Sequence, residues 1–179
     1  MPRRLLALLV VVVVAAGGLP ASSAAASPAA ALIAATRRAA AGFDDAGAAL
    51  RAGYVPSSVS GPVEHWLNEG LLRHGATLDP KHPEGLVYID TGHGLRLVAA
   101  MFMLHHVGQP VPVVPGAIWH HHNWCQGVGG IGIPLPGGPC PPGTTTHVGP
   151  EMLHVWMADV AIPVFATNMA PAVVCRLAA

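Results

Sequence analysis

Small and apolar residues recur along the first part of the chain at intervals of three and four. They fall on one helical face, at Thr36, Ala40, Phe43, Gly47, Leu50 and Tyr54. Ser27 and Pro28 suit the N-cap and first turn of a helix, while Gly53 and Pro56 are typical of its end. The spacing therefore predicts one amphipathic helix from about residue 27 to residue 53.

After Pro56 the pattern changes to short apolar runs separated by glycine, proline and asparagine. We predict strands at residues 85–89, 95–104, 117–125 and 152–160, with a hairpin turn at 91–94. Residues 126–150 are predicted to be a Gly/Pro-rich loop, and residues 166–179 to be irregular or to end in a short strand. The expected fold is α+β, with the N-terminal amphipathic helix packed on a small antiparallel β core that has long Gly/Pro-rich loops.

The first 26 residues have the pattern of a secretory signal peptide. Arg3 and Arg4 precede an unbroken apolar run at residues 5–16, and small residues at 24–26 fit a cleavage site. A membrane anchor is the alternative, but a spanning helix needs about 20 apolar residues. We therefore expect a signal peptide at 1–26, a single secreted or extracytoplasmic domain at 27–179, and no membrane span in the mature chain.

Charge adds little to this picture. Two of the nine basic residues, Arg3 and Arg4, lie in the predicted signal peptide, so seven basic residues face nine acidic ones in the rest of the chain. The sequence contains no basic patch that would favour nucleic acid. No other partner is indicated.

Three cysteines, Cys125, Cys140 and Cys175, are expected to meet an oxidising environment. Cys125 and Cys140 flank a Gly/Pro-rich segment, and we favour a disulfide between them because it would hold the ends of that loop together. Cys175 is then either free and buried, or the partner of one of the others in place of this bond.

Candidate chemistry comes from eleven histidines, all between residues 65 and 154. His120 and His122 would share one face of the predicted third strand, and His154 lies in the fourth, so the three converge if these strands are neighbours. His65 is the natural fourth candidate. Imidazoles on strands are suitable ligands for Zn or Cu. The alternative is structural: in that interpretation the triplet at 120–122 is only solvated, and His154 is a core histidine bonded to backbone.

Other chemistry has less support. The chain has no G-x-S-x-G motif, and its glycine-rich segment at 127–132 is not followed by a predicted helix, which argues against a nucleotide loop. A reactive Cys125 is disfavoured by the expected disulfide. Glu64 and Glu151 are the only convenient carboxylates for a metal-dependent enzyme.

An ordered series of short motifs runs through most of the chain: DDA (44–46), HWLN (65–68), LDP (78–80), PEGLVY (83–88), HHN (121–123), CPPGTT (140–145) and MLHVW (152–156). This series resembles a family of uncharacterised secreted proteins of the actinobacterial type, over about residues 36–175. One departure is His65-Trp66, where the family has His-Tyr. The resemblance implies an extracytoplasmic single domain and no established activity.

Three functional hypotheses follow. The first is a secreted domain that binds Cu or Zn through His65, His120, His122 and His154. The second is a metal-dependent enzyme with an open coordination position. The third is a structural or interaction domain without a ligand.

Overall fold

The computed structural model describes residues 26–127, 130–132 and 140–178. The predicted signal peptide therefore lies outside the described residues, apart from Ala26. The predicted mixed α+β class with an antiparallel sheet is confirmed. In the described parts of the chain, no helix is long and apolar enough to cross a membrane.

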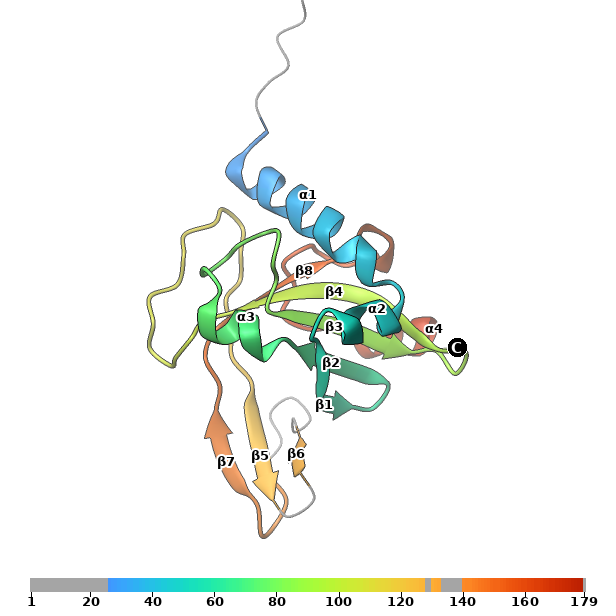
Figure 1. Cartoon of the computed structure of the whole chain (residues 1–179). Coiled ribbons are helices and arrows are strands. Elements are labelled where there is room, and N and C mark those ends of the chain that lie inside the picture. The colour runs from blue at the N-terminus through green and yellow to red at the C-terminus, as the bar shows by residue number, and fades with distance from the viewer. Residues whose placement is uncertain (1–25, 128–129, 133–139, 179) are drawn as a thin grey trace, which may run out of the picture.

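A five-stranded antiparallel sheet forms the centre of the fold, in the order β1-β2-β3-β4-β8 (Figure 1). Its strands are β1 (Val55–Ser60), β2 (Val63–Leu67), β3 (Gly85–Asp90), β4 (Leu95–Met103) and β8 (Met152–Trp156). The predicted hairpin joins β3 to β4, and the Thr91 N–H and hydroxyl both donate to the Gly94 carbonyl. The sequence pattern did not predict β1 and β2, because neither shows the alternation that marks a strand: β1 contains three serines, and β2 has two adjacent polar residues followed by two adjacent apolar ones.

The predicted single helix is in fact broken. It consists of α1 (Pro28–Ala40), the 3₁₀ turn η1 (Ala41–Phe43) and α2 (Ala46–Arg51). Ser27 caps α1 as expected, but Asp45 starts a second helix by accepting a hydrogen bond from the Gly47 N–H at 2.9 Å. A competing N-cap inside a periodic segment therefore ends the continuous helix, although the apolar spacing continues through it.

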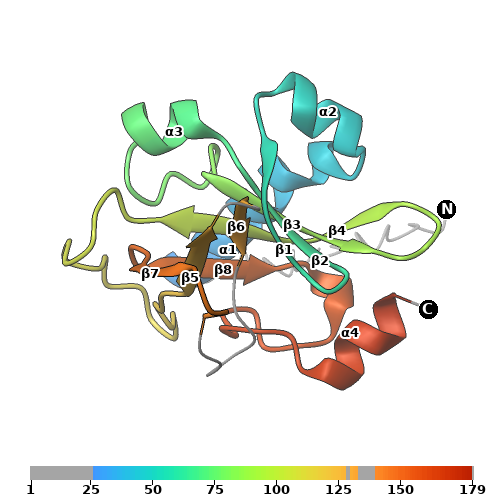
Figure 2. The same cartoon turned by 90° about the horizontal axis from the view of Figure 1, so that it is seen from below.

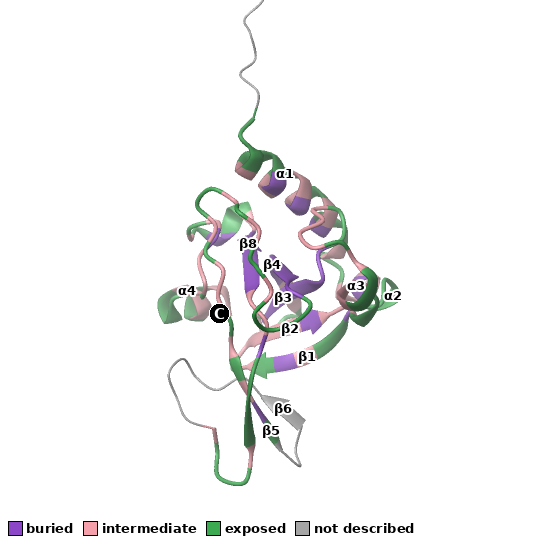
Figure 3. Cartoon of the chain, turned by 90° about the vertical axis from the view of Figure 1, so that its left-hand side faces the viewer, coloured by how far each residue is buried: buried purple, intermediate pink, exposed green. Residues whose placement is uncertain are grey.

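The two faces of the sheet bury different kinds of residue. One, the helix face, carries Trp66, Leu86 and Tyr88 and packs against α1 and α2 (Figure 3). Arg37 of α1 reaches the end of β8 and donates two hydrogen bonds to the Trp156 carbonyl, at 2.6 and 2.9 Å. Because side chains alternate along strands, His65, Met101 and His154 point to the opposite face, which we call the histidine face.

The histidine face is covered by the C-terminal part of the chain. Helix α4 (Pro171–Leu177) packs Val173 and Val174 near Val87 and Trp156. The prediction of an irregular or strand-like tail holds for residues 166–170 but is wrong for residues 171–177, which form a helix packed against the sheet. Two short helices complete the fold, α3 (Glu69–His74) and the 3₁₀ turn η2 (Ala158–Val160), and the latter ends the predicted fourth strand early.

A second sheet, ordered β6-β5-β7, projects from the histidine face, with α1 on the far side (Figure 2). It contains β5 (Asn123–Gly127), β6 (Gly130–Gly132) and β7 (Thr145–Val148). The strand predicted at 117–125 is therefore wrong for most of its length, because residues 117–122 form only an isolated bridge between His120 and Met152. The predicted Cys125–Cys140 disulfide is confirmed, and Cys175 is free and exposed rather than buried.

Glu84, just before β3, is a fully buried carboxyl group. One oxygen accepts a hydrogen bond from the Met103 N–H at 3.4 Å, and the other has no partner among the described residues. Burial raises the pKa of Glu84 to about 7. The native state thus holds this proton more tightly than the unfolded chain, and this favourable contribution is lost as pH rises from about 4.5 through 7.

We expect Glu84→Gln to gain stability relative to the native chain as pH rises from 5 to 8, by roughly 1–3 kcal/mol. The amide keeps the shape and the acceptor but has no proton to lose. Urea unfolding of both proteins at pH 5 and pH 8 measures the effect. The quantity to compare is the difference in unfolding free energy between the two proteins at each pH. The buried histidines contribute to stability with the opposite pH dependence, but both proteins contain them, so their contribution cancels. If the difference in unfolding free energy between the two proteins is the same at pH 5 and pH 8, burial does not raise the pKa of Glu84.

Candidate metal centre

Four histidine rings from three parts of the chain meet on the histidine face. His65 comes from β2 and His154 from β8, while His120 and His122 come from the segment before β5. The ring centroids of His120 and His154 are 4.9 Å apart, and those of His120 and His122 are 5.1 Å apart. The other centroid distances are 6.1 Å from His65 to His154, 6.3 Å from His65 to His122 and 6.4 Å from His122 to His154. The structure thus brings together all four of the histidines that the sequence proposed as ligands.

His154 and His120 are oriented by backbone carbonyls. His154, only 2 % exposed, has its Nδ1 3.1 Å from the Thr167 carbonyl, and the Nδ1 of His120 lies 3.3 Å from the Ile118 carbonyl. A carbonyl can only accept, so each Nδ1 carries the proton and donates it. The Nε2 of each neutral ring then keeps a free lone pair. Histidines that bind a metal through one ring nitrogen characteristically donate a hydrogen bond from the other ring N–H in this way.

The nitrogens inside the cluster have no hydrogen-bond partner. Six buried side-chain atoms in the described residues lack one, and four of them belong to this cluster: His65 Nδ1, His120 Nε2, His122 Nε2 and His154 Nε2. Leaving a buried polar atom unsatisfied costs about 1–3 kcal/mol. Four such atoms gathered in one place require an explanation, and a shared ligand would provide one.

The cluster favours neutral imidazoles. Burial, reinforced by the neighbouring rings, lowers the pKa of His65 and of His122 to about 4. Burial also lowers the pKa of His120, and it lowers that of His154 well below its ordinary value. At neutral pH the rings therefore carry no charge, which is the form that binds a metal ion.

The cluster is wider than a closed coordination sphere. Within the described ranges, no group of three or more His, Cys, Asp or Glu side chains is placed to hold a metal ion as it stands. Four imidazoles bound tetrahedrally to zinc, with Zn–N bonds of about 2.0–2.1 Å, would place their ring centres about 5 Å apart. Two of the observed centroid distances match this value and three exceed it by about 1 Å, so binding would require the rings to move closer together.

Backbone contacts fix the segment that carries His120 and His122, although it is not a strand. The His120 N–H donates to the Met152 carbonyl at 3.0 Å, and the Met152 N–H donates to the His120 carbonyl at 2.6 Å. The Gly149 N–H donates to the His122 carbonyl at 3.1 Å. The first two bonds connect His120 to β8, and the third connects His122 to the residue that follows β7 of the small sheet, so both sheets hold these rings near His154.

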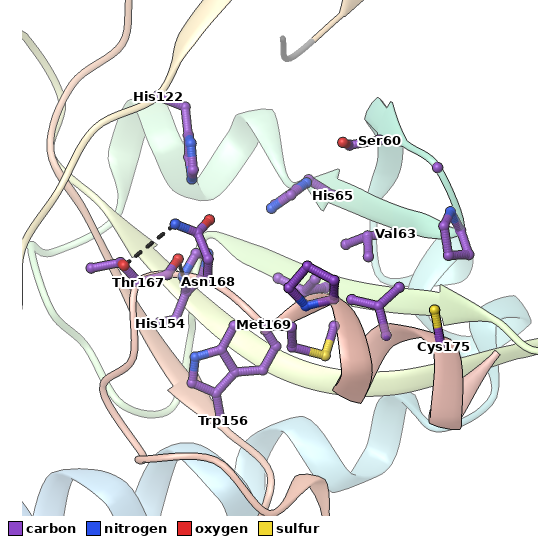
Figure 4. Close-up of a pocket in the computed structure, with 15 residues that line it drawn as sticks. Ser60, Val63, His65, His122, His154, Trp156, Thr167, Asn168, Met169 and Cys175 are labelled. Carbon is purple, nitrogen blue, oxygen red and sulfur yellow. Dashed lines mark hydrogen bonds between the residues drawn. The ribbon is translucent and has the colours of Figure 1, made fainter. Parts of the chain in front are cut away.

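A cavity of about 360 Å³ opens beside the cluster, with His65, His122 and His154 in its wall (Figure 4). Its remaining lining is mostly apolar and includes Trp156, whose ring centroid is 5.2 Å from that of His154. Trp156 thus lines a pocket next to a histidine, whereas Trp66 packs on Tyr88 on the helix face.

No protein-family model, curated protein or solved structure matches this chain. The resemblance to a family of secreted proteins therefore stays a prediction. The assignment of the histidine cluster depends on its geometry and chemistry alone.

The remaining candidates lie elsewhere. Glu64 accepts a hydrogen bond from the Trp66 indole at 2.8 Å, and Glu151 lies 3.0 Å from the Nδ1 of His121. The other seven histidines are exposed, at positions His74, His82, His93, His105, His106, His121 and His147. Thr167 and Ile118 could not be found from the sequence, because each contributes a backbone carbonyl that any residue could supply.

Proposed function

We propose that this protein binds one transition-metal ion, copper or zinc, through His65, His120, His122 and His154. The observation that carries the proposal is the set of four buried ring nitrogens that have no hydrogen-bond partner among the residues the structure describes. Neutral imidazoles suit both metals. The carbonyls of Ile118 and Thr167 support the proposal because they leave Nε2 of His120 and His154 as the binding atom.

The same observation argues against a purely structural role. A core histidine stabilises a fold when both of its nitrogens are satisfied, and here the buried inner nitrogens are not. A cluster of surface histidines would instead be solvated, whereas His154 is 2 % exposed. The arrangement is costly to the folded chain unless a ligand offsets that cost.

An enzymatic role is the second candidate, and the 360 Å³ cavity favours it, because an organic molecule there would contact the cluster. The two carboxylates considered as acid or base do not support it. Neither Glu64 nor Glu151 is in the described lining of that cavity, and each is engaged by another side chain. We therefore place metal binding first.

We also propose that the protein acts outside the cytoplasm. The disulfide between Cys125 and Cys140 supports export, because such bonds persist in oxidising compartments. Delivery through residues 1–26 stays a prediction.

Metal binding should raise thermal stability. At a free metal concentration of about 100 times Kd, a ligand that binds only the folded state adds about 2.7 kcal/mol. For a domain of this size that corresponds to an increase in Tm of roughly 5–10 °C. The measurement is thermal unfolding of chelator-stripped, tag-free protein with Zn²⁺ or Cu²⁺. Mg²⁺ is the matched control, since it prefers oxygen ligands and should leave Tm unchanged. No shift with either transition metal would remove the proposal.

A further inference from the structure

Methionine side chains gather around the histidine cluster. The chain has six methionines, and four of them line the two cavities that share His65 in their walls. Met169 lines the cavity already described. The second cavity, of about 240 Å³, is lined by Met101, Met103 and Met152 together with His65. Three methionine side chains and one histidine ring thus line this second cavity.

The strand register places these methionines on the histidine face. In the pairing of β4 with β8, Met101 lies opposite His154 and Met103 opposite Met152. All three methionines are nearly fully buried, at 2–4 % exposure. Gly85 is the partner of Met101 in β3, and a Cβ there would lie 2.5 Å from the Met101 methyl carbon. Because Gly85 has no side chain, the methyl group of Met101 can pack against its backbone.

Simple packing does not account for this cluster. Methionine is common in cores because its flexible side chain fills irregular gaps. Here three of them pack with Leu67 and Leu72, yet a cavity remains beside them. The one carboxylate in the lining, Glu69, has a side chain that is 62 % exposed and lies 3.5 Å from Arg73. Besides Glu69, the described lining thus offers three thioethers, one imidazole and two serine hydroxyls, all of them uncharged.

Soft donors discriminate between metals. Thioethers select Cu(I), whereas zinc is bound by imidazole, thiolate and carboxylate. We propose that the metal of this protein is copper, and that Met101, Met103 and Met152 form with His65 a Cu(I)-binding chamber beside the four-histidine cluster. This inference rests on the proposed function, which it narrows from copper or zinc to copper.

The test is an anaerobic Cu(I) titration against a chromogenic competitor, bicinchoninate, on the full chain. Met101→Leu/Met152→Leu removes two thioethers and conserves volume, which cores tolerate well. We expect the affinity for Cu(I) to fall at least 10-fold while the affinity for Zn²⁺ is unchanged. Met157→Leu is the matched control, because Met157 is partly buried and lines neither cavity. It should change neither affinity.

The outcomes separate this inference from the proposed function. If the double variant binds Cu(I) as tightly as the native chain, or the native chain binds Zn²⁺ but not Cu(I), the chamber is wrong and the histidine site stands. If the native chain binds neither ion, both fail. Should the double variant not fold, X-ray absorption of the native Cu(I) complex decides. Sulfur in the copper shell supports the chamber, and nitrogen alone overturns it.

Discussion

Replacing His120 and His122 together with alanine is expected to abolish stoichiometric metal binding. The pair supplies two of the four unpaired buried nitrogens. Loss of a residue that merely orients a ligand already costs about 10- to 100-fold in metal affinity, so losing two ligands should cost at least about 100-fold. Competition with a chelator of known affinity measures the change for Zn²⁺ and Cu²⁺.

The matched control for this variant is His105→Ala/His106→Ala, a second pair of histidines that is exposed and lies outside the four-ring cluster. It should bind metal like the native chain. We expect the His120/His122 variant to stay folded, within about 1 kcal/mol of the native chain without metal, because both residues are only half-buried and precede a strand. Native-like metal affinity in this variant would show that the metal is held elsewhere.

Removing the disulfide should weaken both the fold and the metal site. Cys125→Ser/Cys140→Ser opens a loop with a sequence separation of 15 residues, and the chain-entropy model gives a loss of about 3 kcal/mol in the free energy of unfolding. His122 lies three residues before Cys125, so a looser small sheet should place this ring less accurately. We expect metal affinity to fall, but less than in the His120/His122 variant.

Urea unfolding and chelator competition together measure these two effects. Cys175→Ser is the control, since Cys175 is free and exposed. It should change the free energy of unfolding by no more than about 0.5 kcal/mol. If loss of the disulfide left stability and metal affinity unchanged, the small sheet would not be what holds His122 in place.

Most of the central strands could be predicted from the sequence, because they are the buried apolar runs that a hydrophobic pattern detects. The apolar runs of β3, β4 and β8 are recognisable without a structure. Strands β1 and β2 are not, because both are half-exposed and neither alternates: β1 is rich in serine, and β2 has two adjacent polar residues followed by two adjacent apolar ones. The break between α1 and α2 is a local competition: Asp45 caps a new helix within a periodic segment, and the apolar spacing alone does not reveal it.

The histidine site was predicted from partly incorrect local structure. His154 lies on a strand as expected, but His120 and His122 do not share the face of a regular strand. They reach the site through the isolated bridge between His120 and Met152, which is a long-range contact. The methionines carried no sequence signal, because only the register of β4 against β8 shows that they lie beside the histidines.

The most direct test of the central claim is the anomalous scattering of metal-soaked crystals, recorded on both sides of the zinc and copper absorption edges. We expect one strong peak within bonding distance, about 2.0–2.1 Å, of nitrogens from at least three of His65, His120, His122 and His154. A peak at an exposed histidine such as His82 or His93, with none in the cluster, would contradict it.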